Sequence, residues 1–495
     1  MTIFAPKTKY ADMESLKEKT AKGLFWGGMN NGVQQLVGMV FGIILARLLS
    51  PGDYGMMAMI SVFSLVAIAI QNSGFTVALA NLSEPRDEDY NSVFWFNIIV
   101  GITLYVVLFF SAPLIAWYYD EPELVPLCRY AFLNILLASL GTAQSAYLFK
   151  NLMVKQYAKA CMTAVVVSCV TGAVLAFNGF AYWSLAIQGL VFIAVSIGMI
   201  WHYSKWRPTL RIDLGPALGM FRFSCKILAT TIVTHVNNNI LNILLGHYFS
   251  KHEAGTYNQA YQWNFKCFSL VQGMVSQVAQ PVLVDLSGDR GRQMNAFRKM
   301  VRFTAFISFP LLFGFALVAR EFIVIAITEK WLESAVLLQM LCLSGAVMPI
   351  CTLLSNMIVS KGRSDIYLYC TLGLALCQIV LLVLTSRFGI HTMVMGFVAI
   401  NIVWMFVWHW FTCRLTGYGI VPFLLDILPF ALVSSGVMAT AYMATAMVES
   451  IYLRFAARVV MAVVLYYAVM RVARVRMLGE CMAFVKGRLG KKNKK

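Results

Sequence analysis

Long apolar stretches alternate with short polar ones along the whole chain. About 20 apolar residues in a helix cross the hydrocarbon core of a bilayer, so each long stretch predicts a membrane-spanning helix. Asn178-Gly179 is a tight-turn signal, and it divides one long apolar region into two spans. We therefore expect an all-α polytopic membrane protein with about 14 spans. These are 22–48, 54–80, 92–118, 124–149, 157–178, 181–202, 217–248, 254–284, 298–320, 333–360, 365–387, 390–413, 424–447 and 452–474.

A motif near the start of the chain recurs 200 residues later. Ile43-Ile-Leu-Ala-Arg-Leu-Leu-Ser50-Pro-Gly-Asp53-Tyr-Gly55 aligns with Ile243-Leu-Leu-Gly-His-Tyr-Phe-Ser250-Lys-His-Glu253-Ala-Gly255, with serine, an acid and glycine in matching places. Six spans separate the copies, so both copies cross the membrane in the same direction, as in repeat-built transporters. The predicted domains are an N-terminal tail (1–21), a six-helix lobe (22–202), a connecting loop (203–216), a second six-helix lobe (217–413), two further spans (424–474) and a basic tail (475–495).

Composition and charge agree with a membrane location. The chain is 60% hydrophobic and 13% charged, with a mean hydropathy of +0.72. Its 40 Lys and Arg against 22 Asp and Glu give a net charge of +18, but about 30 of these basic residues fall on one side of the predicted topology. The positive-inside rule then places both termini in the cytoplasm, and the first span is expected to act as its own insertion signal. This net charge does not require a nucleic-acid partner, because basic tails commonly contact lipid headgroups.

Cysteine and motif content give no sign of an enzyme. The 11 cysteines include no CxxC pair, so neither a zinc site nor a disulfide framework is indicated, and no metal or cofactor is expected. No phosphate-binding loop and no dinucleotide-binding glycine motif is present. Asp87-Glu88-Asp89 has the acid-x-acid spacing of some glycosyltransferases, but a short acidic run is usually a solvated loop. Transport driven by a gradient or by substrate flux fits these features better than catalysis does.

The predicted helices 217–248 and 254–284 carry more polar side chains than lipid-facing helices need. A lysine at the centre of a span costs about 2.5–3.5 kcal/mol on insertion, so Lys266 should face protein or water. Pro281 is expected to interrupt the second helix. No Asp or Glu falls well inside a predicted span. A basic cavity without carboxylates selects an anion such as phosphate or diphosphate, and amides suit sugar hydroxyls. The candidate substrate-binding residues are Lys266, Lys226, Arg129, His235, Asn30, Asn31, Gln34, Asn238, Asn242 and Gln262.

Several of these residues have simpler interpretations. Arg129 and Lys226 could extend toward lipid headgroups, as long basic side chains near helix ends do. His235 could be a core histidine or a proton carrier. The asparagines at 237–239 could serve helix packing.

The segments Gly23-Leu-Phe-Trp-Gly-Gly28 and Leu48-Leu-Ser50-Pro51-Gly-Asp53-Tyr54-Gly55 resemble the polysaccharide-transporter branch of the multidrug/oligosaccharidyl-lipid/polysaccharide exporter superfamily. This branch includes the Wzx-like O-antigen, capsule and colanic-acid flippases. The resemblance implies a MATE-like two-lobe fold in the bacterial inner membrane that works by alternating access. It also implies an undecaprenyl-diphosphate-linked oligosaccharide as substrate, with membrane lipids and the polysaccharide polymerase machinery as partners.

Three alternatives stay open at this point. A lipid II flippase would share nearly every feature described above. A drug or cation antiporter of the MATE type would need a carboxylate in a lobe cavity. A membrane-embedded glycan polymerase would need large periplasmic loops, whereas the outer loops predicted here are short.

Overall fold

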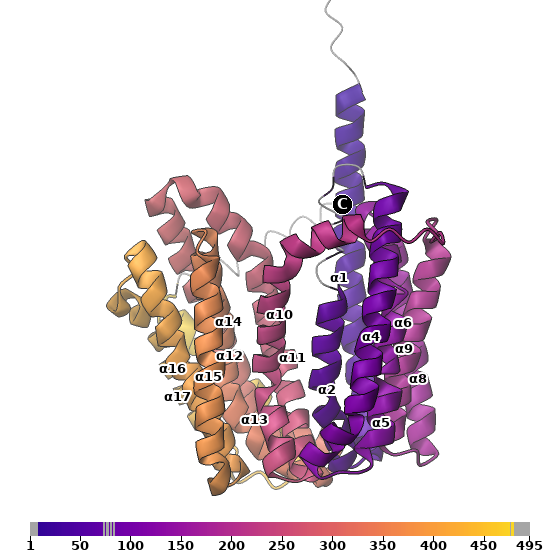
Figure 1. The fold of residues 1–495 in the computed structure, drawn as a ribbon. Helices are drawn as coiled ribbons and strands as arrows, with labels where there is room; N and C mark the ends of the chain where they lie inside the picture. The colour runs from indigo at the N-terminus through magenta and orange to yellow at the C-terminus, as the bar shows by residue number, and fades with distance from the viewer. Residues whose placement is uncertain are drawn as a thin grey trace, which may run out of the picture. The chain divides into compact units, whose positions relative to one another are not determined.

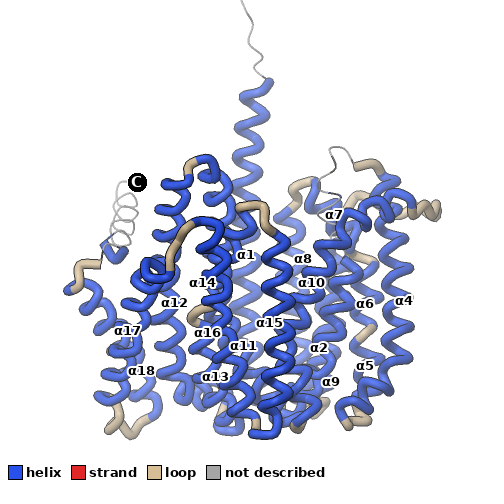
Figure 2. The backbone as a smooth tube through the Cα atoms, turned by 60° about the vertical axis from the view of Figure 1, so that its left-hand side comes forward, coloured by secondary structure: helices blue, strands red, loops and turns tan. Residues whose placement is uncertain are grey.

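The computed structural model describes residues 8–72, 75, 79, 82, 85–475 and 477–479, and every regular element in these ranges is a helix (Figures 1 and 2). The α-helices are α1 (Thr8–Leu48), α2 (Pro51–Asn72), α4 (Asp87–Tyr119), α5 (Leu124–Ala131), α6 (Leu133–Ser139), α7 (Thr142–Lys150), α8 (Val154–Phe177), α9 (Tyr182–Tyr203), α10 (Gly215–Tyr248), α11 (Lys251–Asp285), α12 (Arg290–Ile327), α13 (Leu332–Gly345), α14 (Met348–Ser360), α15 (Ser364–Thr385), α16 (Ile390–Thr416), α17 (Ile420–Ala444) and α18 (Ile451–Val472). Short 3-10 turns follow α11, α12 and α15, at Leu286–Gly288, Glu329–Trp331 and Ser386–Phe388.

The prediction of an all-α multi-pass membrane protein is confirmed. Within the described residues, 12 helical segments are long and apolar enough to cross a membrane, or 13 if the bent pair Leu124–Ser139 and Thr142–Lys150 forms one span. The expected count of 14 was therefore approximate. The bend of 41° breaks what the sequence predicted as one helix over 124–149. The predicted turn after α8 is confirmed, with Gly179 at φ +81, a backbone conformation that favours glycine.

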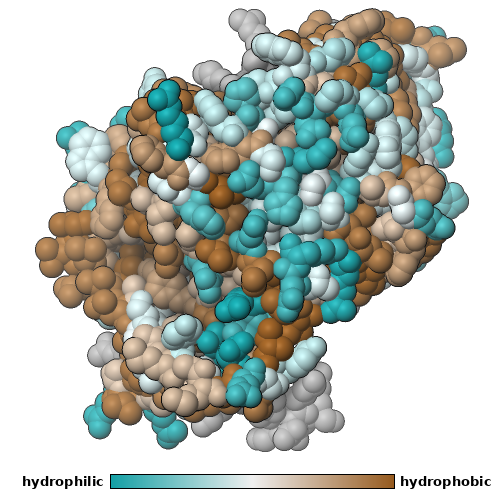
Figure 3. Space-filling view, turned by 90° about the horizontal axis from the view of Figure 1, so that it is seen from below, coloured by the Kyte–Doolittle hydropathy of each residue, from teal (hydrophilic) through white to brown (hydrophobic). Residues whose placement is uncertain are grey.

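Large apolar side chains cover much of the helix surface. Phe110, Trp117, Leu425 and Leu432 are more than 60% exposed, although they lie inside predicted spans. In the space-filling view of Figure 3, broad continuous areas are apolar and the hydrophilic residues gather in limited areas. Such a surface suits lipid rather than water as the surrounding medium.

The chain divides into two compact units, Met1–Asn239 and Ile240–Lys495, and the division falls inside α10. In the first unit, α8 packs on α9 and on α1, while α4 packs on α5, α6 and α7. In the second unit, α12 contacts α11, α13, α17 and α18, and α16 contacts α13, α14 and α15. The domain boundaries expected from the sequence stay a prediction.

The two copies of the repeated motif form the same local structure. At the start of α2, the Ser50 backbone N–H donates to Asp53 Oδ2 (2.8 Å) and the Asp53 N–H donates to Ser50 Oγ (3.3 Å). At the start of α11, the Ser250 N–H donates to Glu253 Oε2 (3.1 Å) and the Glu253 N–H donates to Ser250 Oγ (3.3 Å). Each pair is a capping box, in which two orphan donors at a helix N-terminus are satisfied reciprocally. In both copies, the repeated motif therefore forms the N-terminal cap of the helix that follows it, α2 in the first copy and α11 in the second.

The segment that follows α9 is fixed on α4 of the same unit. The Asn91 side chain accepts from the Thr209 backbone N–H (2.9 Å), and the Trp95 indole donates to the Thr209 carbonyl (2.7 Å). Trp206 is buried in an apolar cluster with Tyr90 and Phe94. The connecting loop predicted over 203–216 is thus anchored on the first unit through Trp206 and Thr209, while Leu210 and Ile212 are exposed.

A buried carboxylate joins α12 to α17. Asp426 is 2% exposed, accepts from Nε of Arg298 (2.8 Å) and of Arg302 (2.6 Å), and accepts from the Tyr418 hydroxyl (2.7 Å). Burial and the contact with Asp426 raise the pKa of Tyr418, so its hydroxyl stays a donor. We call these four residues the Asp426 cluster.

A second buried carboxylate joins α12 to α18, near the other end of α12. Glu321 is 1% exposed, and its Oε1 lies 2.8 Å from Arg458 Nη1 and 3.0 Å from Arg454 Nε. Arg458 also donates to the Leu317 carbonyl (3.1 Å) and to Thr445 Oγ1 (3.2 Å). We call Glu321, Arg454 and Arg458 the Glu321 cluster.

These two clusters correct one expectation. The sequence placed Asp426 and Glu321 at span ends or in loops, whereas both are buried inside helices that qualify as spans. The two further spans predicted over 424–474 also take part, since α17 and α18 are joined to α12 through buried ion pairs. The physical reason is charge compensation, because a buried carboxylate becomes tolerable when arginines surround it.

Candidate substrate-binding sites

One face of α11 carries a line of polar side chains that the helices of its own unit leave uncovered. The opposite face is buried against α12, α13 and α14, with Trp263 4% and Asn264 3% exposed. Spacings of three and four residues keep side chains on one face of a helix. The uncovered line, which we call the polar stripe, consists of Asn258, Gln262, Lys266, Ser269, Gly273, Gln277 and Gln280.

Lys266 lies in the middle of this stripe and near the middle of α11. Its Nζ is 4.4 Å from the centre of the Trp263 ring. A cation over an aromatic face recovers part of the hydration that burial removes. No carboxylate among the described residues pairs with Lys266, so the ammonium donors are left for a ligand. The predicted role of Lys266 in binding an anion stays a prediction, and its position is compatible with it.

Pro281 does not interrupt this helix, contrary to the expectation from the sequence. α11 is continuous from Lys251 to Asp285 with Pro281 inside it. Pro281 is exposed, near the end of the helix, where the loss of one backbone donor is easily accommodated.

Close packing between α11 and α13 holds the buried face of α11 in place. A Cβ atom added at Gly345 would collide with Oδ1 of Asn264, so an alanine there would force the buried Asn264 side chain to move. We expect Gly345→Ala to destabilise the protein by about 1–3 kcal/mol through overpacking. Thermal unfolding in detergent measures this, and Gly273→Ala, where a Cβ meets nothing, is the matched control. Equal stability of the two variants would contradict this prediction.

The candidates on α10 share one side of that helix but differ in burial. His235, Asn238 and Asn242 are spaced by three and four residues. Asn242 is 3% exposed and its Oδ1 has no hydrogen-bond partner, whereas Asn238 is exposed and His235 is half-buried. The side chain of Lys226 lies outside the described part of the structure, so its predicted role stays a prediction. Gln262, on α11, lies one turn before Lys266 in the polar stripe.

Arg129 is stacked on an aromatic ring of the first unit. It belongs to α5, and its guanidinium carbon lies 4.3 Å from the centre of the Phe109 ring on α4. The Nε atom of Arg129 is buried without a hydrogen-bond partner. The structure therefore places Arg129 in a helix-packing contact, and it lines none of the cavities described below.

Two of the three predicted residues of α1, Asn30 and Asn31 but not Gln34, line a cavity of about 730 Å³ inside the first unit, which we call the unit-1 cavity. Asn30 is 8% exposed and accepts from the Gln34 side chain (2.9 Å), while Asn31 is exposed. The remaining lining comes from α6 to α9 and the loop between α6 and α7. Its polar members are Thr142, Ser145, Tyr157 and Ser196. The sequence identified the α1 contribution and missed the other helices, because no local pattern shows which helices pack around α1.

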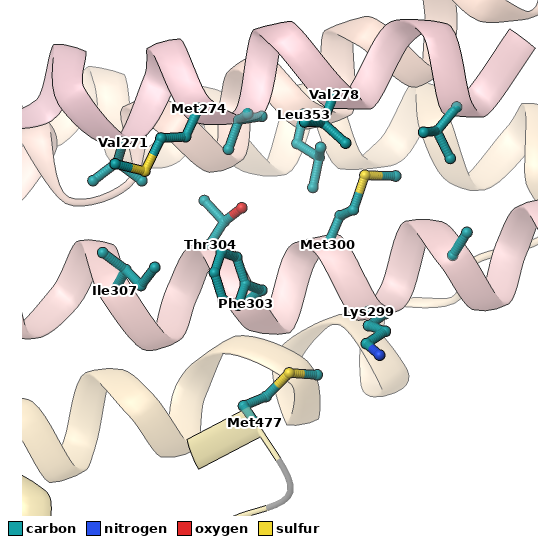
Figure 4. Close-up of a pocket in the computed structure, with 13 residues that line it drawn as sticks. Val271, Met274, Val278, Lys299, Met300, Phe303, Thr304, Ile307, Leu353 and Met477 are labelled. Atoms are coloured by element: carbon teal, nitrogen blue, oxygen red, sulfur yellow. The ribbon is translucent and has the colours of Figure 1, made fainter. Parts of the chain in front are cut away.

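A cavity of about 540 Å³ in the second unit is lined almost entirely by apolar side chains (Figure 4). Figure 4 shows α11 contributing Val271, Met274 and Val278 from one side, and α12 contributing Met300, Phe303 and Ile307 from the other. Lys299 is the one charged residue of its lining, and we call this space the apolar cavity.

A further cavity of about 520 Å³ continues along α12. It is lined by α12 from Phe306 to Val318 and by α17 and α18, and Ile307 lines both cavities. From Met300 to Val318, α12 extends about 27 Å at ~1.5 Å per residue. That length is close to the ~30 Å thickness of a hydrocarbon core. The two cavities together offer a path on which a long hydrocarbon chain could lie.

The helical fold, the apolar surface and the cavities together define a membrane transporter of the multi-pass class. The chain belongs to a family of polysaccharide biosynthesis proteins, whose model matches residues 44–336, more than half of its length. The resemblance seen in the sequence is thereby confirmed at the level of the family.

Individual relatives agree with this assignment. The chain is 25% identical over 366 residues to the teichuronic acid biosynthesis protein TuaB of Bacillus subtilis, covering 74% of this chain and 76% of the relative. It is 25% identical over 424 residues to the succinoglycan biosynthesis transport protein ExoT of Rhizobium meliloti, covering 85% and 84%.

Solved structures show the fold. The lipid II flippase MurJ in an inward closed conformation matches with a TM-score of 0.70 and 14% identity, covering 91% of this chain and 99% of MurJ. An inward-facing multidrug transporter of the MATE family matches with a TM-score of 0.64 and 16% identity, covering 78% and 94%. The chain therefore has the fold that MurJ and this MATE-family transporter show.

Proposed function

We propose that this protein moves a polyprenyl-diphosphate-linked oligosaccharide across the bacterial inner membrane, from the cytoplasmic to the periplasmic leaflet, for the assembly of a surface polysaccharide. The observation that carries the proposal is Lys266, an ammonium group inside a membrane helix with no carboxylate partner among the described residues. A bound diphosphate would supply the missing negative charge and accept several hydrogen bonds. Family membership and the names of TuaB and ExoT support the polysaccharide part of the proposal.

The remaining features fit the other parts of such a substrate. The amides of the polar stripe on both sides of Lys266 suit the hydroxyl groups of a glycan. The cavities along α12 suit the hydrocarbon tail, whose burial against apolar side chains needs no polar partner. In this mechanism, the head group leaves one side of the membrane and reaches the other as the transporter alternates between two openings, while the tail stays in an apolar environment.

The asymmetric distribution of Lys and Arg supports cytoplasmic termini for this topology. The translocated product would then be available to a polymerisation reaction on the periplasmic side, so the polysaccharide polymerase machinery is the expected partner. Membrane lipids surround the apolar helix surfaces.

The pairing of the buried carboxylates with arginines disfavours a cation antiporter. Asp426 and Glu321 are buried inside spans, but each is paired with two arginines and neither is available to a cationic solute. The half-buried Lys266 would also repel a cation. Lipid II shares the polyprenyl diphosphate and is the nearest alternative substrate, so it belongs in the same experiment.

The test is transport in proteoliposomes. Purified protein should increase the translocation of a polyprenyl diphosphate carrying a neutral tetrasaccharide, relative to protein-free vesicles, with lipid II and an organic cation as parallel substrates. Preference for the tetrasaccharide lipid supports the proposal. Preference for lipid II would make the protein a lipid II flippase, and export of the cation alone would make it a drug antiporter.

A further inference from the structure

The unit-1 cavity has a chemical character that differs from the surroundings of Lys266. No charged side chain is among its lining residues in the described part of the structure. Its volume of about 730 Å³ falls in the usual range of small-molecule sites, ~300–1,000 Å³. An uncharged cavity of this size does not suit a diphosphate, because an isolated anion in it would lose hydration without gaining a counter-charge.

Several polar groups inside the cavity have unused hydrogen-bonding capacity. Asn30 and Thr142 are 8% and 5% exposed. The hydroxyls of Thr142 and Ser145 have no hydrogen-bond partner among the described residues. The Asn30 oxygen accepts from Gln34, but its amide N–H₂ has no acceptor there. Buried polar groups are normally paired, so these groups indicate a polar occupant.

The rest of the lining is apolar and partly aromatic. Phe149, Tyr157 and Phe192 present rings to the same space. One helical turn before Asn30, Trp26 lies beneath Lys155, whose Nζ is 5.4 Å from the ring centre. A sugar ring has hydroxyl groups around its edge and C–H bonds on its faces, so it needs this combination of amides, hydroxyls and flat apolar surfaces.

We propose that the unit-1 cavity is a glycan subsite, which binds uncharged sugar residues of the lipid-linked oligosaccharide. This inference rests on the proposed function, since it assigns a part of the same substrate to a second site. It defines the substrate class further: the oligosaccharide contains a stretch of neutral sugars, without uronic acid or free amine, that enters the first unit.

The test uses a triple variant that removes polar groups from the cavity lining: Asn31→Ala, Thr142→Val and Ser145→Ala together. Two substrates are compared in proteoliposomes, a polyprenyl diphosphate with a neutral tetrasaccharide and the same lipid with a single hexose. We expect the variant to transport the tetrasaccharide lipid about tenfold more slowly, the factor that corresponds to one or two lost hydrogen bonds. Transport of the single-hexose lipid should be unchanged.

The matched control combines Thr103→Val, Thr171→Val and Asn178→Ala. These side chains belong to the same unit, but each donates only to its own helix, at Ile99 O, Val167 O and Val174 O. The control should transport both substrates like the wild type. An equal loss of both substrates in the cavity variant, or no loss of either, overturns the glycan subsite.

A binding measurement separates this inference from the proposed function. The free neutral tetrasaccharide, without lipid or phosphate, is added to detergent-solubilised full-length protein and followed by saturation-transfer NMR. Binding to the wild type and to the control, but not to the cavity variant, supports the subsite even if no flipping is observed. Absence of binding to the wild type, or stronger binding of a tetrasaccharide that contains uronic acid, contradicts it.

Discussion

Replacing Lys266 by alanine is expected to slow translocation of the tetrasaccharide lipid by about tenfold to a hundredfold. A hydrogen bond to a charged group contributes about 1.5–3 kcal/mol, and Lys266 has no carboxylate among the described residues that could take the place of a ligand anion. The loss should be larger for diphosphate-containing lipids than for neutral ones, because the lost interaction is with the phosphate oxygens. The measurement is the initial rate of flipping in proteoliposomes at equal protein content.

Two further variants define what the Lys266 result means. Lys266→Arg keeps the positive charge and should retain more activity than alanine. Lys361→Ala removes one positive charge from the turn after α14, distant in sequence from the polar stripe, and should transport normally. If Lys266→Ala folds and flips at the wild-type rate, the polar stripe is not the diphosphate site, although the family assignment is unaffected. If Lys361→Ala loses as much activity as Lys266→Ala, net charge rather than position accounts for the effect.

The features that follow from local sequence could be predicted well. Hydrophobic length predicted the spans, Asn178-Gly179 predicted a turn, and the repeated motif predicted two equivalent segments, which form matching capping boxes at Ser50–Asp53 and Ser250–Glu253. These succeed because each depends on residues within one or two turns of each other, where spacing alone determines the contact.

The features that depend on pairing between distant helices could not be predicted in the same way. Arg458 and Glu321 are 137 residues apart, and each alone is indistinguishable from a charge at the end of a span. The spacing of Arg298 and Arg302, one helical turn apart, was the available signal that two cations face one partner. The carboxylate they share could be identified only once α12 and α17 were seen to pack together.

In the candidate site, too, the local features could be predicted and the contacts between distant helices could not. Lys266 and Asn30 were singled out because polar residues are unfavourable in a span, which is a local argument. That Asn30 shares a cavity with Thr142 and Ser196, and that Lys266 lies over Trp263, depends on helix rotation and packing. The stacking of Arg129 on Phe109 likewise depends on the packing of α5 on α4, and the predicted role of Arg129 in substrate binding stays a prediction.

Removing the carboxylate of the Glu321 cluster is expected to have the largest effect on stability. Glu321→Gln leaves Arg458, 6% exposed, without its main counter-charge, while Arg454 loses the same partner. Removing one partner of a buried ion pair lowers the free energy of unfolding by about 3–5 kcal/mol. The variant should therefore unfold at a clearly lower temperature in detergent, and less of it should be recovered from membranes.

The chain offers a matched control and a rescue for this prediction. Asp365 pairs with Arg363 on the surface, with both side chains about half exposed, so Asp365→Asn should leave the stability nearly unchanged. Adding Arg458→Met to Glu321→Met removes both buried charges and should restore part of the loss, because apolar groups of similar size replace a buried pair at little cost. If Glu321→Gln were as stable as Asp365→Asn, the cluster would not hold α18 on α12. If the double variant were less stable than Glu321→Met alone, Arg458 would stabilise α18 through Leu317, Thr445 and Tyr442 rather than through its charge pair.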